Sequence, residues 1–289
     1  MLRVEQGTSR GRAVSRCSFQ PAELSEQQFQ NVSRTVHRLC GIHLSRKKKA
    51  LVQARLAKRI RKLGIAGFDE YFDLIHSRQG ARELGCMVDA LTTNKTSFFR
   101  EAAHFDFLNE KILPALEKTR IRFWSAACSS GQEPVSMAIA TREHLPGINS
   151  RDVRILATDI SVQMLAKARQ GRYPACEMDG LPPAIQRRYF RPVAGQEDAQ
   201  QMFSVRPEIR AMIHYAQLNL VHPWPMQGPF DVIFCRNVMI YFKRETQQQL
   251  IDRFWDYLVP GGYLFVGHSE GLSGISHQFR YICPATYRK

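Results

Sequence analysis

The chain has 289 residues, which allows one large domain or two of ordinary size. Its 41 lysine and arginine residues outnumber 26 aspartate and glutamate residues, which gives a formal net charge of +15. Such a basic chain favours an acidic partner: nucleic acid, an anionic membrane or an acidic protein surface. Seven cysteines without a CxxC pair argue against a disulfide framework and against a zinc knuckle.

The first residues are polar and basic without an apolar core, so a signal peptide is not expected. We predict a disordered segment over residues 1–20. The most apolar run, residues 232–242, is interrupted by Arg236 and Asn237, which argues against a membrane span. Together with the free cysteines, this predicts a cytoplasmic protein without membrane insertion.

Helix signals dominate the first third of the chain. Ser25 and Gln28 have the spacing of a capping box, and apolar residues then recur at helical intervals. Further helices are expected over residues 46–63, 69–76 and 81–91. The pattern predicts a small helical bundle, which we assign to residues 21–93.

The second of these helices, residues 46–63, is predicted to bury one stripe and to expose strongly basic faces. The apolar stripe consists of Val52, Leu56, Ile60 and Leu63. The basic residues, with no acid among them, are Arg46, Lys47, Lys48, Lys49, Arg55, Lys58, Arg59, Arg61 and Lys62. Such a helix could dock an acidic protein, bind nucleic acid or simply be a solvated charged face.

After residue 120, short apolar strands alternate with helices. Strands are expected over residues 121–126, 153–158, 213–218, 231–235 and 263–267, and helices from Pro134, over 161–170 and over 244–258. We expect Pro260-Gly261-Gly262 to end the last helix and a hairpin around Pro284 to follow. This alternation predicts an α/β fold with a doubly wound, mostly parallel sheet.

Residues 172–212 do not fit the alternation. They separate a helix from the next strand and greatly exceed the usual αβ loop of roughly 2–6 residues. Because residues 202–205 have a strand pattern, we predict a small inserted β-subdomain.

Two predicted strands end in residues suited to an adenosine-containing cofactor. The first leads into residues 125–134 (SAACSSGQEP), whose small side chains would let a ligand approach the backbone. The second ends in Asp159, which could accept hydrogen bonds from ribose hydroxyls. A loop of small residues is also common in α/β proteins without such a site.

The absence of GxGxxG and GxxxxGK[ST] motifs argues against NAD, FAD and P-loop nucleotide binding. S-adenosylmethionine (SAM) carries no phosphate but does carry an ammonium and a carboxylate group. Glu133 could bind the ammonium group and Arg100 the carboxylate. Alternatively, Glu133 only favours a helix dipole and Arg100 is a solvated surface charge.

Two further segments carry polar residues where a ligand could bind: the end of a predicted strand and the junction between the two halves of the chain. The strand at residues 231–235 delivers Arg236 and Asn237 at its end, with Tyr241 shortly after. Residues 91–101 join the two halves of the chain, and domain junctions are common ligand sites. The alternative for this junction is a capped turn with Asn94 or Thr96 as the helix N-cap.

Four motifs in these segments resemble those of the CheR-type chemotaxis receptor methyltransferases. Residues 94–101 (NKTSFFRE) resemble the family signature NxTxFFRE, and residues 125–134 resemble its SAAxSxGEEP loop. Residues 234–242 (FCRNVMIYF) and 267–270 (GHSE) are similar to two further family segments. The motifs occur in the family order, and the resemblance covers residues 24–287.

The resemblance implies a helical N-terminal domain that docks on receptors, followed by a SAM-dependent methyltransferase domain over residues 94–289 with an inserted β-subdomain. It implies methyl transfer from SAM to glutamate side chains of chemotaxis receptors. The family's SAM-contacting positions fall on Asn94, Thr96, Arg100, Glu133, Asp159, Asn219, Leu220, Arg236 and Asn237. Arg100 and Tyr241 are the residues expected to serve the chemical step, and no metal is expected.

Gln132 and Val135 depart from the family loop, which has glutamate and tyrosine there, but Glu133 is retained. We therefore expect cofactor binding to be retained. Phe98, Phe99 and Tyr241 are expected to exclude water from the reacting groups.

Receptor docking is assigned to the basic helix, through Arg55, Arg59 and Arg61. The chain is expected to act as a monomer at receptor arrays and not on nucleic acid. Family members can also hold a receptor tail peptide on the β-subdomain. Here residues 191–201 form a longer stretch with one glycine, so we expect no dependence on such a peptide.

Two other classes of function were weighed. A nucleic-acid methyltransferase would suit the charge, but the sequence lacks the [DN]PP[YFW] motif of adenine N6 enzymes and the Pro-Cys nucleophile of cytosine C5 enzymes. A non-enzymatic receptor adaptor on a degenerate methyltransferase fold is disfavoured by the intact candidate cofactor positions.

Overall fold

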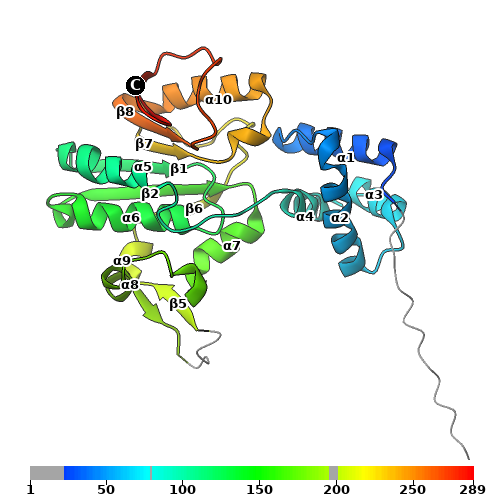
Figure 1. The fold of residues 1–289 in the computed structure, drawn as a ribbon, viewed down its shortest axis with the longest axis horizontal. Coiled ribbons are helices and arrows are strands. Elements are labelled where there is room, and N and C mark those ends of the chain that lie inside the picture. Colours follow the sequence, from blue (N-terminus) through cyan, green and yellow to red (C-terminus); the bar gives the residue numbers. More distant parts are fainter. Residues whose placement is uncertain (1–22, 79, 195–200) are drawn as a thin grey trace, which may run out of the picture.

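The computed structural model describes residues 23–78, 80–194 and 201–289. The segment predicted to be disordered, residues 1–20, lies outside these ranges. Figure 1 shows a helical domain beside a larger α/β domain, with a small β-subdomain below the latter in this view. Within the described ranges, no helix combines the length and the apolar character needed to cross a membrane.

The helical domain consists of α1 (Glu26–Cys40), α2 (Lys49–Leu63), α3 (Phe68–His76) and α4 (Ala81–Leu91). The predicted capping box is confirmed: Ser25 accepts a hydrogen bond from the backbone of Gln28, whose side chain binds the Ser25 backbone. Val36, Leu56, Tyr71 and Met87, one from each helix, are fully buried in the shared core.

Two details of the basic helix differ from the prediction. Residues Arg46–Lys48 form a separate 3-10 turn before α2. Leu63, expected in the buried stripe, is 37% exposed. It is the last residue of α2, next to Gly64, which adopts a left-handed conformation with φ of 68° and ends the helix.

The α/β domain is built on a seven-stranded sheet with the order β6-β2-β1-β7-β8-β10-β9. These strands are β1 (Arg120–Ser125), β2 (Asp152–Asp159), β6 (Ile213–Gln217), β7 (Phe230–Cys235), β8 (Leu258–Val266), β9 (Arg280–Cys283) and β10 (Thr286–Arg288). The first five positions in the order pair in parallel, whereas β10 pairs antiparallel with β8 and β9. This confirms the predicted mostly parallel sheet and the terminal hairpin.

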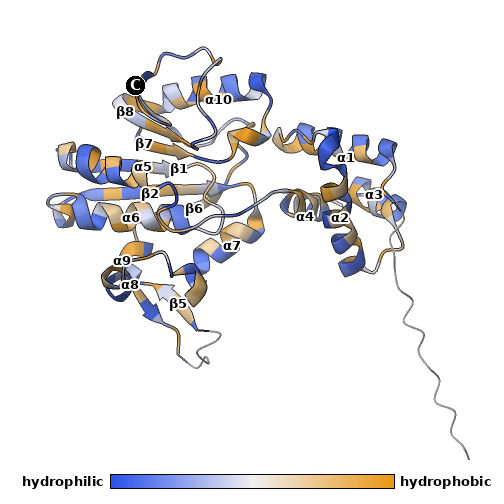
Figure 2. Ribbon diagram, in the orientation of Figure 1, coloured by the Kyte–Doolittle hydropathy of each residue, from blue (hydrophilic) through white to orange (hydrophobic). Residues whose placement is uncertain are grey.

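Helices cover both faces of the sheet (Figure 1). One core contains α5 (Ala102–Phe107), its continuation through Leu108–Ile112 and Leu113–Ala115, and α6 (Gln132–His144). The opposite core contains α10 (Arg244–Tyr257). Phe234 belongs to the first core and its neighbour Ile233 to the second, because side chains alternate across a strand. Figure 2 shows the resulting apolar interior of the sheet.

Other short elements complete this domain. They are α7 (Val162–Gln170) and the 3-10 turns Ile148–Ser150 and Met239–Tyr241. The helix expected over residues 161–170 is confirmed as α7, and Ser161 is its N-cap, whereas α5 was not predicted.

The segment Pro260-Gly261-Gly262 was predicted to end a helix but forms part of strand β8. Helix α10 ends at Tyr257, and β8 begins at the next residue. Gly261 has a φ of 79°, and the pairing register with β7 shifts nearby, between Phe230 and Val232. The glycines therefore allow an irregularity within a strand.

The predicted insertion is confirmed as a small antiparallel subdomain. Its strands β3 (Arg172–Pro174), β5 (Met202–Val205) and β4 (Phe190–Pro192) pair in the order β3-β5-β4. The turn Ala175–Glu177 and the helices α8 (Pro183–Tyr189) and α9 (Pro207–Arg210) complete it. Six residues of the stretch discussed for a tail peptide, 195–200, lie outside the described residues.

The helical domain packs directly on the end of the sheet at which the parallel strands finish. The His43 amide donates to the Tyr241 carbonyl at 2.7 Å, and the Asn219 side chain donates to the Leu39 carbonyl at 2.6 Å. Gly41 approaches so closely that a Cβ there would lie 2.6 Å from a Val221 methyl carbon. The two domains therefore share one packed junction.

A buried ion pair stabilises the helical domain. Arg59 on α2 donates to both carboxylate oxygens of Glu83 on α4, at 2.6 and 2.5 Å, and the Tyr71 hydroxyl donates at 3.0 Å. Burial raises the pKa of Glu83, but the hydrogen bonds from Arg59 and Tyr71 outweigh it and bring the pKa below its ordinary value of 4.5.

We predict that Glu83→Gln lowers the free energy of unfolding by about 2–3 kcal/mol, because it leaves the Arg59 charge uncompensated. Because the pKa of Glu83 is lower in the folded than in the unfolded protein, the ion pair stabilises the fold at pH values above the unfolded-state pKa. This stabilisation is lost as the pH falls through the folded-state pKa. Urea titrations should therefore show the difference at neutral pH and its loss in acid. Asp73→Asn on the exposed side of α3 is the control, and an equal effect there would contradict the assignment.

Candidate cofactor site and active site

A cavity of about 290 Å³ lies between the helical domain and the sheet. The segments that follow β1, β2, β6 and β7 contribute to its wall, as do Cys40, Ile42 and the residues that link the domains. All ten sequence-predicted cofactor and catalytic residues line it: Asn94, Thr96, Arg100, Glu133, Asp159, Asn219, Leu220, Arg236, Asn237 and Tyr241. The site thus lies at the carboxyl ends of parallel strands, where α/β proteins bind ligands.

The loop after β1 is held against the end of β2 by Asp159. The two carboxylate oxygens of Asp159 accept hydrogen bonds from the backbone amides of Ser129 at 2.8 Å and Ser161 at 2.9 Å. Burial raises the pKa of Asp159, although these hydrogen bonds oppose the shift. Gly131 has a φ of 95°, and a Cβ there would lie 2.9 Å from the Ala168 Cβ, so the tight loop requires glycine.

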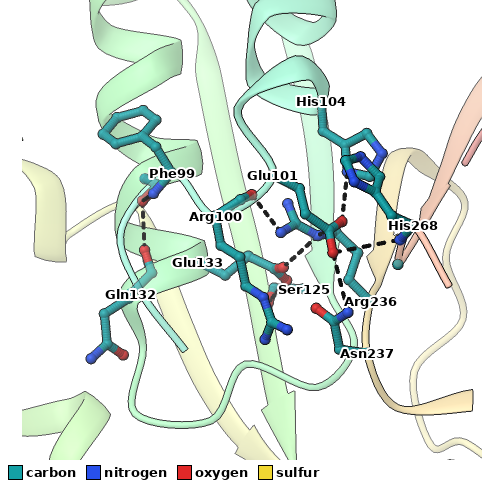
Figure 3. A network of polar contacts seen from close by, with 12 residues as sticks. Phe99, Arg100, Glu101, His104, Ser125, Gln132, Glu133, Arg236, Asn237 and His268 are labelled. Atoms are coloured by element: carbon teal, nitrogen blue, oxygen red, sulfur yellow. Dashed lines mark hydrogen bonds and ion pairs between the residues drawn. The ribbon is translucent and has the colours of Figure 1, made fainter. Parts of the chain in front are cut away.

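Arg236 is a buried cation between two carboxylates (Figure 3). Its side chain is 1% exposed, and its Nε lies 3.6 Å from Glu101 Oε2 and 3.4 Å from Glu133 Oε2. Its Nη2 donates to the backbone carbonyl of Arg100 at 2.5 Å. One guanidinium therefore ties the end of β7 to the interdomain link and to the first turn of α6.

The pKa values of the two carboxylates shift in opposite directions. Burial raises the pKa of Glu101, but Arg236 and a hydrogen bond from Asn237 outweigh it, so this pKa is lowered. Burial raises the pKa of Glu133, and neither Arg236 nor the Ser125 hydrogen bond at 2.7 Å reverses that shift. Glu133 is thus the less favourable of the two places for a negative charge, and a cationic group of a ligand beside it would favour its ionised form.

Arg100 is partly buried on the cavity wall, where its Nη1 donates to the Lys95 carbonyl at 2.9 Å. Its place on the cavity wall suits a contact with the cofactor carboxylate, but its bond to Lys95 is exposed, so this role stays a prediction. The capped-turn alternative for the link is wrong, because α5 begins only at Ala102 and neither Asn94 nor Thr96 precedes a helix.

Two of the aromatic residues expected to exclude water from the reacting groups do not face the cavity. Phe98 packs edge-on against Tyr173 and Phe190 of the β-subdomain, and Phe99 packs against Phe105. Neither Phe98 nor Phe99 lines the cavity, whereas Phe105 does. No sequence pattern indicated α5, the helix that brings Phe105 there.

The side chain of Asn219 is used in structural contacts. Its amide nitrogen donates to Leu39 across the domain junction, and its oxygen accepts from the Val221 amide at 3.2 Å. Asn219 lines the cavity while its side chain fixes the junction.

Glu101 is the site residue that sequence reasoning missed, although it lies in the NKTSFFRE motif. Glu101, His104 and His268 each offer a ligand atom, and these atoms lie within 4.8 Å of one another (Figure 3). Burial and the charge of Arg236 lower the pKa of His104 to about 4. Because Arg236 and Asn237 already contact the Glu101 carboxylate, we assign this group to them rather than to a metal ion.

The three predicted docking arginines do not reach this cavity. Arg55 donates to the carbonyls of Leu91 and Thr92 at 2.8 and 2.9 Å, and Arg59 is paired with Glu83. Arg61 is exposed. Two of the three thus make contacts inside their own domain.

Family models match nearly all of the described chain. The model "CheR methyltransferase, all-alpha domain" matches residues 27–92, and "CheR methyltransferase, SAM binding domain" matches residues 94–287.

Curated relatives agree with these matches. The chain is 44% identical over 254 residues to a "Probable chemotaxis protein methyltransferase" of Rhizobium etli, covering 86% of this chain and 94% of that protein. It is 39% identical to the "Chemotaxis protein methyltransferase" of Borreliella burgdorferi, covering 92% and 95% of the two chains. Identity to the Escherichia coli protein of the same description is 39%, with coverage of 89% and 88%. The chain therefore belongs to the CheR methyltransferase family.

Proposed function

We propose that this chain transfers a methyl group from SAM to glutamate side chains of chemotaxis receptors, producing glutamate methyl esters and S-adenosylhomocysteine. The proposal rests chiefly on one cavity that combines a buried acid at the end of β2, a buried carboxylate with a raised pKa and a partly buried arginine. These groups match the ribose, ammonium and carboxylate of SAM, and the family membership supports the same reading.

The cofactor would be held by residues from both domains. Asp159 would accept hydrogen bonds from the ribose hydroxyls, Glu133 would bind the ammonium group and Arg100 the carboxylate. Leu220, which is 6% exposed, offers apolar contact in the same cavity. The remaining proposed contacts are Asn94, Thr96, Asn219, Arg236 and Asn237.

SAM would supply an electrophilic methyl group on a sulfonium. A glutamate carboxylate is ionised at neutral pH, so this chain needs no general base. A carboxylate oxygen would bond to the methyl carbon as the methyl–sulfur bond breaks, which would neutralise the attacking carboxylate and the sulfonium. Arg100 and Tyr241 would steer the incoming carboxylate, and the apolar wall around Phe105 would exclude water.

Receptor docking is proposed for the exposed side of α2. Receptor methylation regions are helical bundles with acidic faces, which suits this basic helix. Lys58, Arg61 and Lys62 are exposed on neighbouring positions of one helical face. Because Arg55 and Arg59 are held by internal contacts, we place the docking charge mainly on these three residues. The protein would then act in the cytoplasm at receptor arrays.

The proposed reaction predicts a base-labile label on receptors. The protein is incubated with tritiated SAM and receptor-containing membranes, and the labelled membranes are then treated with mild base. Carboxyl methyl esters hydrolyse under these conditions, whereas N-methyl groups do not. Release of the label as methanol is expected, and a label stable to base would contradict carboxyl methylation.

The same assay tests the residues of the chemical step. Tyr241→Phe and Arg100→Ala should strongly reduce the rate, and Tyr241→Phe should do so with little loss of SAM affinity. A Tyr241→Phe enzyme with normal turnover would remove the hydroxyl group from the mechanism.

The ribose assignment predicts weaker cofactor binding in Asp159→Ala. The affinities for SAM and S-adenosylhomocysteine should both fall by about 1–3 kcal/mol, since charge-assisted hydrogen bonds are lost. Calorimetry measures both values. Asp152→Ala, at the exposed start of the same strand, is the matched control. Unchanged affinity in Asp159→Ala would place the cofactor elsewhere.

The docking surface predicts different consequences for neighbouring cations of α2. Lys58→Glu combined with Arg61→Glu should weaken receptor methylation and reduce its salt dependence, while SAM affinity and thermal stability stay unchanged. Arg59→Glu should instead lower stability, because it places a second carboxylate beside Glu83. If the exposed double variant methylates receptors normally but no longer binds RNA or DNA, α2 is a nucleic-acid surface.

A further inference from the structure

We propose that Glu270 and Gln247 are positioning residues that fix the turn of residues 237–242, and with it Asn237 and Tyr241, in the geometry needed for methyl transfer. This inference rests on the proposed function of the cavity. Neither residue lines the cavity, and each contacts the backbone of the turn from a different element.

Glu270 binds the turn through its backbone amides. It is 6% exposed and follows β8. Its Oε2 accepts hydrogen bonds from the amides of Asn237 at 2.6 Å and Gly267 at 2.7 Å, and its Oε1 accepts from the amide of Ile240 at 3.1 Å. Burial raises the pKa of Glu270, although these backbone amides oppose the shift. The carboxylate therefore satisfies donors that would otherwise be buried without partners.

The turn starts at a residue in the left-handed region. Asn237 has a φ of 58°, a conformation that asparagine adopts more readily than most non-glycine residues. Gly267 lies so close that a Cβ there would be 2.6 Å from both Glu270 Oε2 and Asn237 Nδ2. Glycine at this position is what allows the carboxylate and the turn to meet.

Gln247 binds the same turn through its carbonyls. From α10, its amide nitrogen donates to the carbonyls of Met239 at 2.8 Å and Phe242 at 3.2 Å. The Tyr241 carbonyl, in the same turn, accepts a hydrogen bond from the His43 amide of the helical domain. Amides and carbonyls of the turn are thus bound by three separate elements, and the Tyr241 side chain lies on the cavity wall.

Substitutions of Glu270 and Gln247 can change these hydrogen bonds selectively. A carboxylate offers acceptors at both oxygens, whereas glutamine has one acceptor oxygen and one NH₂ group. Glu270→Gln keeps the size of the side chain but sets a donor against backbone donors, on whichever side the amide faces. The turn would then have to move. Gln247→Ala removes only the donors to the carbonyls.

The adjacent residue on α10 provides a matched control. Gln248 is also partly buried and also donates through its amide, but its partners are Asp252 and the Ser276 carbonyl. Its oxygen also accepts from the Ser276 amide at 2.9 Å, so Gln248→Ala removes three side-chain hydrogen bonds without touching the turn.

The test compares receptor methylation by the wild-type protein, Glu270→Gln, Gln247→Ala and Gln248→Ala at a temperature at which circular dichroism shows each to be folded. Because displacements of about 1 Å can reduce rates by up to about a hundredfold, we expect kcat to fall at least about tenfold in Glu270→Gln and about threefold or more in Gln247→Ala. The KM for receptor should change little, since docking lies on α2. Gln248→Ala should stay within about twofold of wild type.

Normal kcat in folded Glu270→Gln and Gln247→Ala would overturn the inference while leaving the proposed function intact. An equal loss in Gln248→Ala would also overturn it, by showing a general effect on α10. If Glu270→Gln fails to fold, the comparison of kcat between Gln247→Ala and Gln248→Ala alone tests the inference. A wild-type protein that transfers no methyl group would refute the proposed function and this inference together.

Discussion

The buried guanidinium of Arg236 is the constraint on which the site depends. A charge with 1% side-chain exposure is tolerated only where opposite charges and hydrogen bonds compensate it. Its partners come from the start of α5, the first turn of α6 and the backbone of the interdomain link. Once β7 delivers Arg236 to the end of the sheet, the positions of those three segments are restricted. The interdomain link, α5 and α6 are thereby arranged around a single charge.

The charge balance also explains how one cavity can receive a ligand that carries both signs. Two carboxylates face one guanidinium, and their pKa values shift in opposite directions, so the one at Glu101 is satisfied inside the protein. The other, Glu133, and the partly exposed cation of Arg100 remain available on the cavity wall. The ammonium and the carboxylate of SAM would then pair with Glu133 and Arg100, so each of these two side chains would gain a partner of opposite charge.

Local signals predicted much of this structure, and long-range contacts account for most of what they missed. The capping box at Ser25, the strands and the loop after β1 follow from neighbouring residues. The pairing of Arg59 with Glu83, which are 24 positions apart, does not, because helix periodicity gives no information on a partner helix. Likewise, the pattern Pro260-Gly261-Gly262 is equally compatible with a helix end and with an irregular strand, and only the neighbouring β7 decides between them.

The shared junction has a consequence for how such proteins can be recombined. Cys40 and Ile42 of the helical domain form part of the cavity wall, and the contacts from Leu39 to Ile42 reach segments after two different strands. A chimaera that exchanged the helical domain at residue 93 would therefore replace part of the small-molecule site along with α2, the helix proposed to dock on receptors. If α2 docks as proposed, a new receptor specificity could be grafted onto this methyltransferase domain only with the residues from Leu39 to His43 kept beside their original partner.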